Sequence, residues 1–291
     1  MPGVVPRVPA RGPRVVAHPA RTDAGRCAVR FLLPPSETKR DGTSAAPLEL
    51  EALSAATLTR DRARIVAALA KYCAKPTPRV RTAIGTTINQ DAELARNARL
   101  VDAPTAPAHA IYDGVLFDAI DLAVVTPDVR TRIIDSVLVQ SALFGIVGFG
   151  DAIPAYRCSA DSSLPRFGRL GTFWRPRLDR VMPQLLGDDL VLDLRSGTYA
   201  SMWTPRADMR ERTAVVKIMQ LRDGKRLAVS HFNKATKGRL VRGLCGLNAP
   251  LSSIDDAVAA IARIGFEAEL VRIKDVNVIE VLTDLGCASL T

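Results

Sequence analysis

Two short apolar runs, each followed at once by a polar loop, constrain the fold of this chain most. Residues 28–33 lead through Pro34-Pro35 into Ser36-Glu37-Thr38-Lys39, and residues 190–194 lead into Arg195-Ser196-Gly197-Thr198-Tyr199. Short apolar runs bounded by proline, glycine or polar residues are typical of buried strands. We therefore predict two buried strands that deliver their last residues into loops, where binding residues are often found.

Helical patterns occur along much of the chain. Apolar residues at helical spacing predict three helices, over residues 60–74, 91–100 and 127–144. The last of these is expected to be long and buried, and to stop at the glycines that follow residue 144. A further helix is expected to begin near Asn233, and Ser252 with Asp255 has the spacing of a helix cap in the tail.

Strand patterns are mixed with the helical ones. A strand broken by Asp113-Gly114 is predicted over residues 111–116, and Asp223-Gly224 suits the turn of a hairpin between residues 213–221 and 227–231. Two more strands are predicted over residues 267–273 and 276–282. Because strands and helices do not alternate strictly, the predicted class is α+β, with a mixed sheet surrounded by helices in one compact domain, residues 28–291.

The start of the chain differs from the rest in composition. Residues 1–27 hold five arginines and five prolines but no apolar segment like that of a signal peptide, so we predict a disordered Pro/Arg-rich arm. Five scattered cysteines without a Cys-x-x-Cys pair indicate a reducing compartment, hence a cytoplasmic protein. The longest uncharged stretch, residues 136–150, is too short to span a bilayer, so no membrane partner is expected.

Positive charge is concentrated in two regions of the sequence. Lys and Arg outnumber Asp and Glu by 40 to 30 over the chain, and residues 206–242 alone hold eleven basic and three acidic residues. Between residues 157 and 180 the arginines are interleaved with aromatic residues, a combination that suits bases and phosphates. An acidic partner such as nucleic acid or a nucleotide is expected, although an ordinary solvated surface explains any single residue equally well.

Several standard active-site motifs are absent from the sequence. It has no H-E-x-x-H, no G-x-G-x-x-G after a strand and no G-x-S-x-G, which excludes the standard hydrolase and dehydrogenase patterns. No metal ligands occur at regular spacing, so no metal site is predicted, and the cofactor stays open. Cys158 follows Arg157, a cation that can lower the pKa of a thiol, but a buried inert cysteine is the more common case.

Seven segments carry a family resemblance when they are taken together and in order. They are Pro34–Lys39, Ala110–Phe117, Ser141–Gly145, Ile153–Arg157, Phe173–Pro176, Asp193–Tyr199, and Val229-Ser230-His231 with Lys234 and Lys237-Gly238. This series resembles the YaaA family, also called UPF0246 or the peroxide stress family, over roughly residues 28–283. The resemblance implies a single-domain α+β fold with a positively charged cleft, a cytoplasmic location, DNA binding and a role in limiting oxidative damage under peroxide.

The segments shared with the family include the polar loops, so their side chains are the candidates to line one cleft. If the protein is an enzyme, we predict that His231, Asp113 and Tyr156 are its catalytic residues and move protons. The remaining candidates are predicted to bind a substrate or nucleic acid: Ser36, Lys39, Tyr112, Arg157, Trp174, Arg195, Ser196, Tyr199, Lys234 and Lys237.

Three hypotheses about function stay open. The first is a cytoplasmic stress protein that binds nucleic acid nonspecifically, or its bases, although Ile84-Gly85 offers one glycine where the family's helix-hairpin-helix feature has two. The second is a nucleobase-modifying oxidoreductase of the oxygenase type that acts on a purine or a nucleotide, for example by N-hydroxylation of adenine; residues 158–161, which depart from the family pattern, motivate it. The third is a scaffold without a ligand, whose candidate side chains would diverge in space. The oligomeric state is not predicted.

Overall fold

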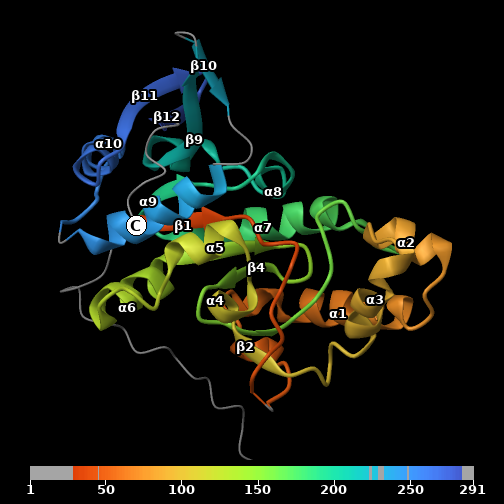
Figure 1. The fold of residues 1–291 in the computed structure, drawn as a ribbon. Helices are drawn as coiled ribbons and strands as arrows, with labels where there is room; N and C mark the ends of the chain where they lie inside the picture. Colours follow the sequence, from red (N-terminus) through yellow and green to blue (C-terminus); the bar gives the residue numbers. More distant parts are fainter. Residues whose placement is uncertain (1–28, 45, 223–224, 229–232, 248, 284–291) are drawn as a thin grey trace, which may run out of the picture.

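A mixed β-sheet forms the centre of the protein. The computed structural model describes residues 29–44, 46–222, 225–228, 233–247 and 249–283. The strands of the sheet are β1 (Val29–Leu33), β3 (Val137–Ser141), β4 (Gly145–Gly148), β8 (Leu190–Asp193), β9 (Thr213–Arg222), β10 (Lys225–Ala228), β11 (Glu267–Ile273) and β12 (Val276–Leu282). Their order is β11-β12-β9-β8-β1-β3-β4, with β10 paired to β9 (Figure 1). The predicted α+β class, a single compact unit with a mixed sheet, is confirmed.

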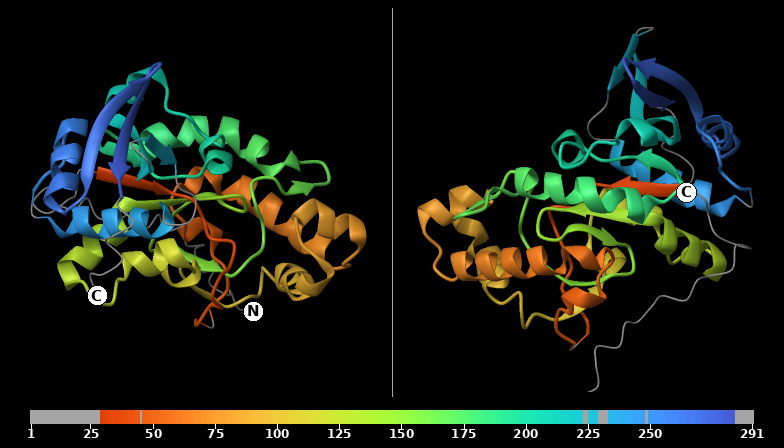
Figure 2. Two further views of the ribbon diagram at one scale, coloured as in Figure 1. Left: turned by 45° about the horizontal axis from the view of Figure 1, so that its top comes forward. Right: turned by 180° about the vertical axis from the view of Figure 1, so that it is seen from behind.

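Helices surround this sheet. They are α1 (Thr59–Cys73), α2 (Pro78–Ile84), α3 (Asp91–Ala98), α4 (Ala108–Ile111), α5 (Val115–Ile120), α6 (Pro127–Ser136), α7 (Leu170–Leu186), α8 (Gly197–Ala200), α9 (Asn233–Gly246) and α10 (Ile254–Arg263). Helices α1, α2 and α3 form a group at one end, whereas β9 to β12 and α10 project at the other (Figures 1 and 2). Outside the main sheet, β2 (Thr105–Pro107) pairs with β5 (Ala152–Pro154), and β6 (Ser163–Leu164) pairs with β7 (Gly168–Arg169).

The apolar runs at residues 28–33 and 190–194 form neighbouring strands, β1 and β8. Strand β1 pairs in parallel with β8, with Leu32 opposite Asp193, and in parallel with β3 on its other side. Both strands are almost wholly buried. Because the carboxyl ends of parallel neighbours meet at one edge of a sheet, the loops that follow Leu33 and Asp193 begin side by side.

Two predicted elements are wrong, and in both the local pattern is ambiguous. Residues 127–144 form α6 and then β3, instead of one long helix, because β3 is buried on both faces and lacks the alternation that distinguishes a strand. Residues 111–116 form the end of α4 and the start of α5, instead of a strand, and Gly114 between them has a φ of 97°. The helix cap in the tail is also shifted by one residue, to Ser253 with Asp256.

Other predicted elements match the structure closely. Helix α1 lies within the predicted residues 60–74 apart from its first residue, α3 begins at Asp91 as predicted, and β11 and β12 have the predicted bounds. The predicted arm over residues 1–27 lies outside the described residues. In the part of the chain that the structure describes, none of the helices combines the length and the apolar character that crossing a bilayer requires.

Candidate functional site

A pocket of about 780 Å³ opens where the loops after β1 and β8 meet. Its lining comes from six separate parts of the chain: residues 34–38, 84–85, 113–117, 157–161, the group 196, 198 and 199, and the group 233, 234 and 237. Seven of the predicted site residues are in this lining: Ser36, Asp113, Arg157, Ser196, Tyr199, Lys234 and Lys237. The structure therefore brings together segments that are up to about two hundred residues apart in sequence, as the cleft hypothesis expects.

Hydrogen bonds join the loop after β1 to the loop before α5. The backbone N–H of Asp113 donates to Ser36 Oγ at 3.0 Å, and Lys39 forms an isolated bridge with Tyr112. The Asp113 carboxylate lies 2.7 Å from the guanidinium of Arg40. These contacts hold the two loops as one wall of the pocket and give the Asp113 carboxylate a cationic partner.

Lys39, Tyr112 and Tyr156 form a cluster behind this wall. The Lys39 ammonium donates to the Ser36 carbonyl at 2.8 Å and lies 4.2 Å from the ring centre of Tyr156 and 5.5 Å from that of Tyr112. Burial lowers the pKa of Lys39 to about 7. The tyrosine hydroxyls are 3.0 Å apart, and burial raises the pKa of both, so they stay protonated at neutral pH. These three candidates support the pocket and do not line it.

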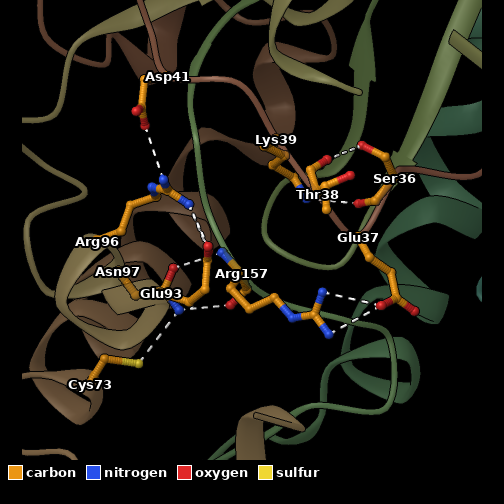
Figure 3. A network of polar contacts seen from close by, with 10 residues as sticks. All are labelled: Ser36, Glu37, Thr38, Lys39, Asp41, Cys73, Glu93, Arg96, Asn97 and Arg157. Carbon is orange, nitrogen blue, oxygen red and sulfur yellow. Dashed lines mark hydrogen bonds and ion pairs between the residues drawn. The ribbon is translucent and has the colours of Figure 1, made fainter. Parts of the chain in front are cut away.

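Arg157 is held at the pocket by a side chain that sequence reasoning missed. Asn97, buried in the last turn of α3, donates to the Arg157 carbonyl at 2.7 Å and accepts from the Arg157 backbone N–H at 2.9 Å (Figure 3). The guanidinium of Arg157 contacts the Glu37 carboxylate through both terminal nitrogens at 3.3 Å. The only signal of Asn97 in the sequence is a polar residue within the apolar pattern of α3.

Two other predicted binding residues are used inside the fold. The Arg195 guanidinium pairs with Asp193 at 2.7 Å and also donates to Gln140 and to the carbonyl of Trp203, so it holds the end of β8 and does not line the pocket. Trp174 is fully buried and donates to the Ala142 carbonyl at 2.7 Å, which leaves no ring face for a ligand. The predicted roles of Arg195 and Trp174 as ligand contacts are therefore corrected to structural ones.

Helix α9 forms one wall of the pocket through Asn233, Lys234 and Lys237, and it packs closely on α5. An added Cβ at Gly238 would lie 2.2 Å from the carbonyl oxygen of Leu116, so only glycine allows this approach. Lys237, one residue earlier, donates to the Leu194 carbonyl at 2.7 Å, and burial lowers the pKa of its ammonium to about 8. His231, predicted to act beside these lysines, lies outside the described residues.

Cys158 lines the pocket but is not poised as a nucleophile. Burial raises the pKa of its thiol to about 12, which outweighs the opposing effects of a hydrogen bond with Ser162 and of the charges of Lys39 and Arg157. The thiol is therefore protonated at neutral pH and weakly reactive. Within the described ranges, no three His, Cys, Asp or Glu side chains come together in a way that could hold a metal ion.

Comparisons with known proteins identify the family of this chain. The family model described as "Peroxide stress protein YaaA" matches residues 29–267. UPF0246 protein SCO2297 of Streptomyces coelicolor is 42% identical over 82% of this chain and 91% of its own length. UPF0246 protein CE1889 of Corynebacterium efficiens is 39% identical over 74% of this chain and 84% of its own length. The resemblance seen in the seven sequence segments is thereby confirmed, and the chain belongs to the YaaA (UPF0246) family of peroxide stress proteins.

Proposed function

We propose that this protein binds nucleobase-containing ligands, either nucleotides or the bases of nucleic acid, in the pocket between β1, β8 and α9, as part of a cytoplasmic response to peroxide. The observation that supports this proposal best is the lining itself. Residues 115–117 and Tyr199 supply apolar and aromatic surface, while Arg157, Lys234 and Lys237 supply positive charge. A volume of about 780 Å³ is in the range of pockets that hold one small molecule and has room for a nucleotide.

The geometry supports binding better than a particular reaction. Asp113, predicted to move protons, is paired with Arg40, and Tyr156 is buried behind the pocket with a raised pKa. His231 lies outside the described residues. Oxidation of a purine such as adenine therefore stays a prediction from the sequence, and we assign no reaction to the pocket.

A pocket-filling substitution tests the proposal. Thr198 is exposed and lines the pocket, so Thr198→Trp should occupy part of the space and weaken nucleotide binding at least about tenfold, or about 1.4 kcal/mol. Isothermal titration calorimetry with purine and pyrimidine nucleotides measures the effect. Thr172→Trp adds the same side chain at an exposed position of α7 outside the pocket and should change nothing. Equal affinities in both variants, or no binding by the unmodified protein, would refute the proposal.

Nonspecific nucleic-acid binding is a second candidate, supported by the hairpin between α2 and α3. Gly85 ends α2 with a φ of 77°, and both Ile84 and Gly85 line the pocket. Arg79 is exposed on α2, and Arg99 is exposed directly after the end of α3. A single strand of DNA bound along this hairpin would lie beside Gly85 at the pocket, where one of its bases could enter.

The salt dependence of binding tests this second candidate. Affinity for single-stranded DNA should fall steeply between low and moderate salt, because each neutralised phosphate releases counterions. The double variant Arg79→Gln with Arg99→Gln should bind more weakly and with a shallower dependence on salt, as fluorescence anisotropy would show. An affinity that is flat with salt would contradict nucleic-acid binding, and so would an unchanged salt dependence in the double variant.

A further inference from the structure

The acidic side chains that line the pocket have ion-pair partners, whereas, in the part of the molecule that is described, two of its basic side chains do not. Each carboxylate in the described lining lies within ion-pair distance of an arginine: Glu37 with Arg157 at 3.3 Å, Asp113 with Arg40 at 2.7 Å, and Asp161 with Arg169 at 3.9 Å. Lys234 and Lys237 also belong to the lining, and among the described residues neither has a carboxylate within that distance. Positive charge without a carboxylate at ion-pair distance is therefore concentrated on the α9 wall, where the charge of Asp193 acts on Lys237 from farther away.

Lys237 is the more telling of the two lysines because it is buried. The residue is only 8% exposed, and its ammonium makes one hydrogen bond, to the Leu194 carbonyl at 2.7 Å. An ammonium has three donors, so two of them lack an acceptor in the described part of the chain. Burying a charge costs free energy, and burial lowers the pKa of Lys237 to about 8, a shift that the charge of Asp193 opposes only in part. An anion in the pocket would supply the missing acceptors.

The bond of Lys237 to the Leu194 carbonyl places its ammonium at the start of the segment that carries other donors of the lining. Ser196 and Thr198 contribute two exposed residues with hydroxyl groups, from the segment in which α8 begins. Asn233 and Lys234 come from the first turn of α9, a helix of 14 residues, so the positive end of its dipole lies at the pocket. Hydroxyls, an ammonium and a helix N-terminus are the groups that proteins commonly use to bind phosphate.

We infer that the α9 wall, formed by Lys237, Lys234, Ser196 and Thr198, holds the phosphate group of a nucleotide. This inference rests on the proposed function and makes it more specific, because it selects a phosphate-bearing nucleotide over a free base or a nucleoside. The apolar surface of residues 115–117 is then the part of the lining that remains for the base.

The test compares adenosine with adenosine 5′-monophosphate, each titrated into the full-length chain by calorimetry. The difference between their affinities gives the contribution of the phosphate. The monophosphate should bind the unmodified protein at least about tenfold more tightly than the nucleoside does. Lys237→Met removes the buried ammonium while keeping a side chain of similar length. This variant should bind the two ligands with affinities within about twofold of each other, and its affinity for adenosine should equal that of the unmodified protein.

Arg239→Met is the matched control, because Arg239 is exposed on the same helix and carries the same charge outside the pocket. Its preference for the monophosphate should stay within about twofold of the unmodified protein's. An equal loss of preference in both variants would contradict the inference. Equal affinities of adenosine and its monophosphate for the unmodified protein would overturn this inference but not the proposed function. This outcome does not depend on whether Lys237→Met folds. Failure of both ligands, and of the other nucleotides, to bind would refute the proposed function as well.

Discussion

Replacement of Arg62 by methionine should lower the free energy of unfolding by about 3–5 kcal/mol, because each buried carbonyl that loses its donor costs about 1–3 kcal/mol. Arg62 is fully buried on α1, and its guanidinium donates to the carbonyls of Phe144, Ser54 and Ile146. Methionine fills a similar volume but donates no hydrogen bond, so three carbonyl oxygens lose their donor. Urea denaturation followed by circular dichroism gives the difference in free energy.

The effect of this substitution should depend on pH. Burial raises the pKa of the Asp151 carboxyl, and the charge of Arg62 opposes that shift. Without Arg62 the folded-state pKa of Asp151 rises further above its unfolded value, so folding favours the protonated carboxyl and the variant gains stability as pH falls through that pKa. The deficit measured at pH 7 should therefore shrink as the pH falls through the raised pKa of Asp151.

Arg64→Met is the control for Arg62→Met. Arg64 is on the same helix, but its side chain is exposed. It pairs with Asp61, three residues away, and lies 5.3 Å from the ring centre of Phe167. Exposed pairs of this kind contribute at most about 1 kcal/mol. If the two variants were equally stable, or if Arg62→Met cost less than about 1 kcal/mol, the buried network would not have the role assigned to it.

Gly238→Ala should destabilise the protein by about 2 kcal/mol, even though alanine favours helices more than glycine does. The added methyl group would lie 2.2 Å from the Leu116 carbonyl oxygen and 2.7 Å from the Ala119 side chain, so α9 must move away from α5. Because α9 carries Lys234 and Lys237, nucleotide affinity should fall together with stability. Thermal denaturation and calorimetry on the same sample measure both quantities.

Gly246→Ala provides the matched comparison for Gly238→Ala. Gly246 is at the other end of α9, and an added Cβ there meets nothing within 4 Å. The higher helix propensity of alanine should leave this variant as stable as the unmodified protein or slightly more stable. A Gly238→Ala protein that unfolds at the same temperature as the Gly246→Ala protein would show that α5 and α9 tolerate separation.

Much of the sheet that positions the site is predictable from the sequence. The runs at residues 28–33 and 190–194 are short, apolar and bounded by loop residues, so they read as buried strands without ambiguity. The switch from α6 to β3 after Ser136 is different, because a strand buried on both faces has no alternation to reveal it. A local pattern cannot separate such a strand from the continuation of a buried helix.

The candidate site is predictable only in part, because a side chain after a strand can turn toward the pocket or into the fold. Ser196 and Arg195 are adjacent in sequence, yet Ser196 lines the pocket and Arg195 pairs with Asp193 and Gln140. The inward orientation of Arg195 depends in part on its hydrogen bond to Gln140 in β3. No local motif in the sequence connects these two residues. Asn97 was missed for the same reason, since its partner is the backbone of a residue 60 positions later.

The double hydrogen bond between Asn97 and Arg157 has a mechanical consequence. The side chain of Asn97, in the last turn of α3, forms hydrogen bonds with both the N–H and the carbonyl of Arg157. The last turn of α3 is thus bonded to the backbone of Arg157, a residue that lines the pocket (Figure 3). We therefore expect a displacement of α3 to move the backbone of Arg157 with it, so a molecule bound to this helix could change the shape of the pocket without touching its occupant.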